Sequence, residues 1–354
     1  MTAARLKHLV TRNDVAEACG VSGALVSYAF SDNAKNKVKS ATREKILRTA
    51  EAMGYQPSLI GRSLKTRRSY NVALLLPEQF ASGISLHQLR IFHGVCLAMQ
   101  ETDYRPMVFF GVNDKFFRTL RERRVDGIIL LDSANDLDYI EELVNFNLPL
   151  VLANVEYRLD SPQAASVRSD HEGIVKLLFR KLVGNNCRKI LLVSAPGDLC
   201  QPNWILQEAF RKEAEIYSSQ GISAISYCPD GYWVNDTMRA QVGKFFQQPE
   251  PVDGVLVDGG AFANMVVEIA EQNGVKLIRN KNCFVTCSQE NNFPNWSQDS
   301  FGVGINAWSA MQKILNGESQ MPLLKIPYFS ADSEEDLRSR GKHLLCSREY
   351  QVDK

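Results

Sequence analysis

The sequence predicts a small all-α head followed by a larger α/β body, and three observations carry that prediction. Thirteen Lys and Arg but only five Asp and Glu stand in residues 1–70, whereas the whole chain of 354 residues is almost neutral. Short helical periods run through residues 10–65, and from residue 71 strand-sized apolar runs alternate with helical stretches. Such alternation is typical of parallel sheets covered by helices, and a chain this long needs more than one core.

Composition excludes several classes of protein. Apolar residues make up 45% of the chain and charged residues 23%, which is too apolar and too balanced for a largely disordered or collagen-like chain. No apolar run approaches the ~18 residues of a membrane span, and residues 1–10 lack the apolar stretch of a secretion signal. We therefore expect a soluble, cytoplasmic protein without a membrane partner.

The first two helices of the head are short and closely spaced. Asn13 is predicted to cap a helix over Asp14–Cys19, which Gly20 ends. Ser22 is predicted to cap a second helix over Gly23–Phe30. Two short helices joined by a turn of a few residues form the helix-turn-helix pattern.

A third, longer helix is predicted over Ala41–Met53, after a lysine-rich loop. Its apolar residues recur at helical spacing. Ser40 or Thr42 is expected to cap its start, and Gly54 to end it. Three such helices are enough to enclose a small core.

The segment 57–65 is predicted to form one or two helical turns that are unstable alone. Pro57 suits a helix start, and Ile60 and Leu64 lie four residues apart on one face. A helix this short is marginal in water, and Gly61 lowers its stability by about another 1 kcal/mol relative to Ala. We expect this segment to be disordered until another surface packs against it.

The charge of the head suggests a partner. Residues 1–70 have a net charge of +8, and the remaining residues have a net charge of −7. A basic head on an acidic body favours a polyanion, such as nucleic acid, as the partner of the head alone. The alternative is a solvated, charged helical surface with no such partner.

The cysteines and histidines do not form an evident metal site. The eight cysteines and five histidines are dispersed, no CxxC pair occurs, and Cys283 and Cys287 have no cluster of His or Cys nearby. We expect reduced cysteines, no metal and no cofactor.

Eight apolar runs in the body are predicted to be strands. They are Asn71–Leu76, Pro106–Phe110, Gly127–Leu131, Pro149–Leu152, Lys189–Val193, Ile222–Tyr227, Gly254–Val257 and Cys283–Thr286. The helical stretches between and after them are Leu89–Glu101, Phe117–Arg123, Tyr139–Phe146, Gly173–Leu182, Ile205–Ser218, Asn235–Phe246, Phe262–Asn273 and Ala307–Leu315. Strands separated by helices predict βαβ units, here divided between two parallel sheets.

The head contains a dense series of short motifs. These are Val10-Thr11, Asp14-Val15-Ala16-Glu17, Gly20-Val21-Ser22, Val26-Ser27, Thr42-Arg43-Glu44-Lys45-Ile46, Gly54-Tyr55-Gln56-Pro57 and Arg62-Ser63-Leu64-Lys65. The series resembles the head of the LacI/GalR family of bacterial transcription regulators, densely over residues 10–76 and more weakly to about residue 317. The resemblance implies a DNA-binding head at 1–56, a hinge helix and linker at 57–70, and a two-lobed effector-binding and dimerisation domain at 71–354.

The resemblance also implies how the head would contact double-stranded DNA. The second helix would lie in the major groove, with the side of the helix that faces base edges formed by Gly23, Ala24 and Tyr28. The positions that match the family's phosphate contacts are Thr11, Arg12, Asn13, Ser22, Ser27, Lys39 and Thr42. In the hinge, Leu64 matches the leucine that wedges into a central minor-groove step. Ser58 and Lys65 are the other candidate DNA-binding residues of the hinge.

The head departs from the family's pattern at the base-reading positions. Gly23 and Ala24 stand where a larger polar pair is usual, and Tyr28 replaces an arginine. Gly and Ala cannot donate side-chain hydrogen bonds, and one hydroxyl cannot copy a bidentate arginine contact. We expect an unusual operator that is recognised more through the hinge and DNA shape. Ser58 replaces the usual Asn and can still cap, and the alternative for Tyr28 is packing on the helix end.

The resemblance implies that the body is similar to periplasmic sugar-binding proteins, with two lobes joined by three crossing segments. We expect these crossings near Ser166–Ser169, Ser297–Phe301 and Leu324–Ile326. A small polar effector, such as a sugar or related metabolite, would bind beyond the carboxyl ends of the strands. The candidate effector residues are Asp132, Asn154, Trp204, Gln207, Trp233, Asp258 and Ser288.

The expected sugar contacts are altered in this chain. Leu206 stands where the family has a sugar-binding arginine, Gly259 where it has an asparagine, and Ser288 where it has an aspartate. These changes remove groups that bind vicinal hydroxyls. Two interpretations remain, namely a different effector or a body that no longer senses one. Lobe packing is the alternative role for Trp204 and Trp233.

The function implied is that of a homodimeric repressor of a near-palindromic operator, in which effector binding changes the angle between the lobes and the spacing of the hinges. Residues 330–354 lack leucine heptads, which predicts a dimer rather than a tetramer. The remote alternative is an α/β enzyme. The body has no Gly-x-Gly-x-x-Gly motif after a strand, no Walker lysine and no Gly-x-Ser-x-Gly motif, so we expect no enzymatic activity.

Overall fold

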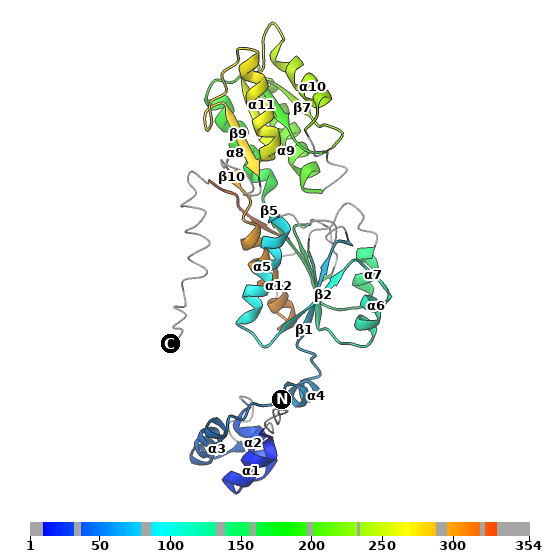
Figure 1. Ribbon diagram of the computed structural model, residues 1–354, viewed down its shortest axis with the longest axis vertical. Coiled ribbons are helices and arrows are strands. Elements are labelled where there is room, and N and C mark those ends of the chain that lie inside the picture. The colour runs from blue at the N-terminus through cyan, green and yellow to red at the C-terminus, as the bar shows by residue number, and fades with distance from the viewer. Residues whose placement is uncertain are drawn as a thin grey trace, which may run out of the picture. The chain divides into compact units, whose positions relative to one another are not determined.

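The chain divides into two units, Met1–Ser69 and Tyr70–Lys354. The structure is a computed structural model, which describes residues 10–31, 37–78, 86–131, 139–155, 157, 161–196, 201–231, 234–287, 296–318 and 323–330 (Figure 1). Each unit has cores of its own. The functional boundaries at 56/57 and 70/71 remain a prediction.

The head is built from three helices around one small core. Its helices are α1 (Arg12–Cys19), α2 (Gly23–Ala29) and α3 (Ser40–Met53). All three contribute to a shared apolar cluster, whose most buried members are Val15, Val26, Ala29, Ile46 and Ala50. The predicted helix-turn-helix is confirmed, because α1 and α2 are separated only by residues 20–22.

Thr11, and not Asn13, caps α1. The Thr11 backbone N–H donates to Asp14 Oδ2 at 2.7 Å, and the Asp14 N–H donates back to Thr11 Oγ1 at 3.4 Å. This capping box needs a hydroxyl and an acid three residues apart, a spacing that Thr11 and Asp14 supply. Asn13 therefore lies inside the first turn, and the cap predicted there is wrong. Gly20 ends the helix as predicted, with φ at 65°.

Basic residues of α3 cap the carboxyl ends of the other two helices. Neither Ser40 nor Thr42 caps α3 itself, since the helix starts at Ser40 and its N-cap, Lys39, makes no side-chain capping bond. Arg43 Nε donates to the Ala29 carbonyl at 2.9 Å, and Lys45 Nζ donates to that of Cys19 at 3.1 Å. Cations at helix carboxyl ends satisfy open carbonyls and oppose the helix dipole.

The hinge segment forms α4 (Leu59–Thr66). Ser58 precedes it without a side-chain capping bond, so the cap predicted there is wrong. Arg67 ends the helix in the left-handed region, with φ at 55°. Leu64 projects from α4 with 80% of its surface exposed.

The body contains two six-stranded sheets. The first has the order β11-β5-β4-β3-β1-β2 and comprises β1 (Asn71–Leu76), β2 (Arg105–Phe110), β3 (Gly127–Leu131), β4 (Leu150–Ala153), β5 (Ala164–Ser169) and β11 (Leu323–Ile326). The second has the order β12-β10-β9-β8-β6-β7 and comprises β6 (Lys189–Val193), β7 (Ser223–Tyr227), β8 (Gly254–Asp258), β9 (Cys283–Cys287), β10 (Trp296–Ser297) and β12 (Phe329–Ser330). Only the β10–β12 pair among these strands is antiparallel, so the predicted parallel sheets are confirmed.

Helices cover both faces of each sheet. On the first sheet, α5 (Leu86–Gln100) and α12 (Ser300–Leu315) share one core, and the other face packs on α6 (Asp114–Arg121) and α7 (Tyr139–Asn145) (Figure 1). The helices of the second sheet are α8 (His171–Gly184), α9 (Gln201–Ser218), α10 (Asp236–Phe246) and α11 (Gly260–Gln272). Gly94 of α5 and Gly304 of α12 let the two helices pack closely. A Cβ on Gly94 would lie 2.3 Å from the Phe301 carbonyl oxygen, and a Cβ on Gly304 would lie 2.1 Å from that of Ile91.

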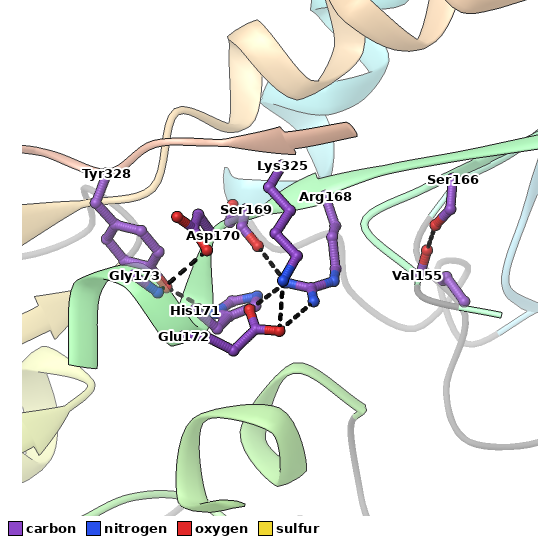
Figure 2. A network of polar contacts seen from close by, with 10 residues as sticks. All are labelled: Val155, Ser166, Arg168, Ser169, Asp170, His171, Glu172, Gly173, Lys325 and Tyr328. Atoms are coloured by element: carbon purple, nitrogen blue, oxygen red, sulfur yellow. Dashed lines mark hydrogen bonds and ion pairs between the residues drawn. The ribbon is translucent and has the colours of Figure 1, made fainter. Parts of the chain in front are cut away.

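The chain passes between the two sheets three times, which confirms the predicted crossings. The passages follow Ser169, Ser297 and Ile326, the last residues of β5, β10 and β11. Two of the crossings are joined by polar contacts. Figure 2 shows Glu172 on α8 accepting two bonds from buried Arg168, at 2.7 and 2.8 Å, and one from Lys325 at 2.8 Å.

At these crossings Glu172 is ionised and His171 is neutral in the neutral to basic range. Burial opposes ionisation of Glu172, but the bonds from Arg168 and Lys325 outweigh it and lower its pKa to about 2. Burial and the charge of Arg168 lower the pKa of His171 to about 3, so its ring is neutral. The His171 Nδ1 and the Tyr328 hydroxyl lie in hydrogen-bond contact at 2.8 Å.

Candidate nucleic-acid interface and ligand site

The amino ends of α1 and α2 lie against one another on the surface of the head. A Cβ placed on Gly23 would lie 3.0 Å from Arg12 Nε and 3.4 Å from Asn13 Oδ1. Most predicted contact residues of these two ends are exposed, namely Thr11, Arg12, Asn13, Ser22 and Ala24. Helix amino ends carry open N–H groups and a partial positive charge, so this surface suits the phosphates of a nucleic acid.

The hydroxyls predicted for phosphate contact differ in whether their protons are already donated within the head. Thr11 Oγ1 donates to Asp14 Oδ2 at 2.8 Å, and Ser27 Oγ donates to the Gly23 carbonyl at 3.1 Å. Ser22 Oγ instead accepts from the Leu25 N–H at 3.3 Å, which leaves its own proton available. Of the three, Ser22 is therefore the residue that can donate to a phosphate without giving up a bond.

Tyr28 is held by a lysine that the sequence analysis did not single out. Lys37 Nζ lies 5.2 Å from the centroid of the Tyr28 ring, in the geometry of a cation–π contact, and the ring is half-buried. This contact favours the packing alternative for Tyr28. The only signal in the sequence was the run of lysines in the loop before α3.

The other predicted DNA contacts lie on α3 and α4. Lys39 and Thr42 are at the start of α3, exposed and half-buried respectively. Ser58 and Lys65 are exposed at the two ends of α4. Leu64 exposes most of its side chain on the same helix, and burying a leucine is worth about 1.5–3 kcal/mol. It therefore offers apolar surface to a partner.

In the first lobe, Asn154 belongs to a buried polar chain that ends β4. Its Nδ2 donates to His87 Nε2 at 2.9 Å, and His87 Nδ1 lies 2.6 Å from Ser300 Oγ. Burial, with the charge of Arg90, lowers the pKa of His87 to about 4, so the ring is neutral and donates from Nδ1. Asn154 Oδ1 is buried and has no partner among the described residues. It can accept a hydrogen bond from a ligand.

In the second lobe, Asp258 ends β8 beside Thr286 of β9. Thr286 Oγ1 donates to Asp258 Oδ1 at 2.8 Å. Burial raises the pKa of Asp258 to about 6, against the lowering effect of that bond. The carboxyl ends of parallel strands are where this class of fold binds ligands, so these two residues are candidates for ligand contact.

Two further candidates on α9 are placed differently from each other. Gln207 Nε2 donates to Ser194 Oγ at 3.0 Å and to the Ala195 carbonyl at 2.9 Å, beyond the end of β6. Trp204 is 59% exposed, which speaks against the lobe-packing alternative for this residue, whereas Leu206 is buried. The remaining candidates lie outside the described residues: Asp132, Trp233 and Ser288.

Thr286, Ser194, His87 and Ser300 were missed as candidate site residues. Thr286 lies in the last residues of β9 and Ser194 directly follows β6, so both were accessible to the same rule that found Asp258. His87 and Ser300 start α5 and α12, and nothing in the local sequence places these helix ends beside β4.

The described residues contain neither a membrane-spanning helix nor a cluster of metal-ligating side chains. No helix in this part of the chain is long and apolar enough to cross a membrane. No group of three or more His, Cys, Asp or Glu among these residues is arranged to hold a metal ion.

A helix-turn-helix head followed by two parallel-sheet lobes with three crossings is an architecture that this chain shares with solved transcriptional regulators. The family described as bacterial regulatory proteins, lacI family, matches residues 11–58. Catabolite control protein A of Priestia megaterium is 25% identical over 338 residues, which cover 90% of this chain and 97% of that protein. The chain is therefore similar to the lacI family in its head and to a catabolite control protein over nearly its whole length.

Other relatives match parts of the chain or its fold. The sucrose operon repressor of Klebsiella pneumoniae is 33% identical over 150 residues, or 40% of this chain and 43% of that protein. The lac repressor dimer bound to operator and an anti-inducer has a TM-score of 0.61 at 17% identity, covering 91% of this chain and 97% of that one. The CelR–cellobiose complex has a TM-score of 0.57 at 19% identity, covering 90% and 98%. These two structures show the shared fold.

Proposed function

We propose that this chain is a sequence-specific, DNA-binding transcription regulator that acts as a homodimeric repressor of a near-palindromic operator. The observation that carries the proposal is the agreement between the family match at residues 11–58 and a folded head whose α1 and α2 amino ends are exposed together. Relatives named as the sucrose and ribose operon repressors cover 40% and 75% of the chain, which supports repression rather than catalysis.

Three functional parts follow from this proposal. Residues 1–56 bind each half of the operator, residues 57–70 form the hinge, and residues 71–354 bind an effector and the second subunit. Two copies of Leu64, exposed on α4, would wedge together into the centre of the operator. The DNA-contacting residues proposed are those of the sequence analysis, with Ser22 as the clearest phosphate donor.

The effector proposed is a small polar molecule bound between the strand ends of the two lobes. Cellobiose is named with one structural neighbour, and sucrose and ribose operons with two relatives, which supports a sugar or a related metabolite. Asn154 Oδ1 and the Asp258 carboxyl favour a ligand that donates hydrogen bonds, such as one with hydroxyl or amino groups. The alternative is a regulator whose body binds no effector. Two observations favour it: Leu206 is buried, and the Gln207 amide already donates hydrogen bonds within the lobe.

Selection of binding sites from random DNA duplexes by the full-length protein tests the proposal. An enriched motif with two-fold symmetry, at near-physiological salt, is the expected result. A thermal-shift screen of sugars then tests the effector, since a ligand at 100 times its Kd adds about 2.7 kcal/mol to the stability. A folded protein that enriches no motif, alone or with any sugar that stabilises it, contradicts the proposal.

A further inference from the structure

We infer that Arg12, the first residue of α1, contacts a guanine in the major groove and takes the place of the side chain that Gly23 lacks. The inference rests on the proposed DNA binding and deepens it, because family resemblance alone places Arg12 at a phosphate. It assigns the main direct base contact of the head to a residue outside the recognition helix α2.

Within α2 itself, no side chain at the start of the helix offers a free donor, and the free hydroxyl of Ser22, which caps the helix, is the one proposed for phosphate. Gly23 has no side chain, and Ala24 has only a methyl group. The Ser27 hydroxyl is turned back to the Gly23 carbonyl at 3.1 Å. The Tyr28 ring is half-buried and lies beneath Lys37 Nζ. Direct reading of a base edge by hydrogen bonds therefore needs a donor from elsewhere.

Arg12 occupies the space that a side chain at position 23 would take. A Cβ on Gly23 would lie 3.0 Å from Arg12 Nε and 3.5 Å from Arg12 Cζ, so the guanidinium lies against the bare start of α2. A larger residue at position 23 would displace it. The missing side chain is therefore what allows Arg12 to reach the surface that the helix presents to the groove.

The guanidinium of Arg12 is available for a new bond. Arg12 is exposed, and its guanidinium makes no hydrogen bond or ion pair with the residues that the structure describes. Other basic residues of the head are engaged within the fold, such as Arg43 with the Ala29 carbonyl and Arg48 with Glu44. The planar guanidinium beside the recognition helix can donate two parallel hydrogen bonds to guanine O6 and N7, which is the usual bidentate contact of arginine.

The two possible roles of Arg12 differ in what they predict. A bidentate contact to guanine discriminates against other bases by between about fivefold and about 150-fold at one base pair. The loss of a phosphate contact instead weakens binding to every sequence alike and reduces the slope of affinity against salt by about one unit.

The experiment is site selection followed by affinity measurements with four full-length proteins. These are the natural chain, Arg12→Leu, Arg12→Lys and the control Arg48→Leu, which removes the same charge from α3. The natural chain is expected to select a symmetric motif with one G·C pair per half-site that depends on Arg12. Arg12→Leu is expected to lose preference at that pair only, Arg12→Lys to weaken it, and Arg48→Leu to keep the whole motif.

A double-mutant cycle tests whether the contact depends on the space at position 23. Gly23→Leu is expected to displace the guanidinium and to reduce preference at the same base pair. In the Arg12→Leu background, Gly23→Leu is expected to cause no further loss there. Thermal unfolding of each variant shows that the head is folded.

Each contrary result has a separate meaning. An unchanged motif in Arg12→Leu, with uniformly weaker binding and a smaller salt slope, would show a phosphate contact and overturn the inference. Independent effects of the two substitutions in the cycle would overturn it too. Failure of the natural chain to select any motif would instead contradict the proposed function.

Discussion

One substitution in the hinge helix α4 is expected to leave the stability of the free protein unchanged but to weaken its DNA binding. Leu64 lies on α4 with 80% of its surface exposed, so the free protein gains little from this side chain. Exposed substitutions usually change stability by no more than about 0.5 kcal/mol. Leu64→Ala is therefore expected to leave the thermal unfolding of the free protein unchanged.

The loss in DNA binding follows from what the side chain would bury in the complex. Full burial of a leucine is worth about 1.5–3 kcal/mol, and the exposed fraction means that most of this is gained only on binding. Two hinges meet in a dimer, so the lower value already gives a loss of about 3 kcal/mol per operator. This corresponds to roughly 150-fold weaker binding.

The assay is titration of the selected operator with full-length Leu64→Ala protein at fixed salt, beside thermal unfolding of the same sample. Ile216→Ala on α9 is the control, because Ile216 is also an exposed aliphatic residue, at 59%, but belongs to the second lobe. Its operator affinity is expected to match that of the natural chain. Operator affinity of Leu64→Ala within about threefold of the natural value would refute the wedge role, because two buried leucines cannot contribute so little.

Three further predictions concern folding. Gly304→Ala is expected to lower the free energy of unfolding by about 1–3 kcal/mol, because its Cβ would lie 2.1 Å from a backbone oxygen of α5; chemical unfolding would measure this. Gly184→Ala is the control: it has open space around it and is expected to change stability by at most about 1 kcal/mol. Asp258 has a pKa raised to about 6, above about 3.9 for an unfolded chain, so the native state binds more protons and stability falls as pH rises between those values. Asp258→Asn is expected to weaken this fall, which unfolding at pH 4 and pH 7 would measure. Thr11→Ala is expected to destabilise the head by about 1 kcal/mol in hydrogen exchange of the α1 amides, whereas Asn13→Ala, which removes no cap, is expected to have little effect.

Much of the body could be predicted because the central strands of its sheets are buried on both faces. β1, β3 and β6 have the residue bounds that their apolar runs predicted, and the other predicted strands differ only at their ends. Parallel strands covered by helices must be apolar throughout, so the sequence marks them without any alternation. Short pairing segments such as β10 and β12 carry no such run: β10 lies at the predicted second crossing, and β12 was not predicted.

Helix ends were harder to predict than helices. Asn13, Ser40 and Ser58 are all residues that favour caps, yet none makes a capping bond at its predicted position. Local preference could not decide between neighbouring candidates at α1, where the reciprocal bonds of Thr11 and Asp14 set the start of the helix. Contacts such as His87 with Asn154 join residues 67 positions apart and carry no local signal at all.

The net charge of the head overestimates the number of basic residues that are available to contact DNA. Arg43 and Lys45 cap the carboxyl ends of α2 and α1, and Lys37 lies on the Tyr28 ring, so at least three of the basic residues already have a role in folding. A charge held in this way would have to break an internal bond before it could neutralise a phosphate. Specific contacts therefore depend on where free donors gather, and the structure gathers them at the joined amino ends of α1 and α2, around Arg12 and Ser22.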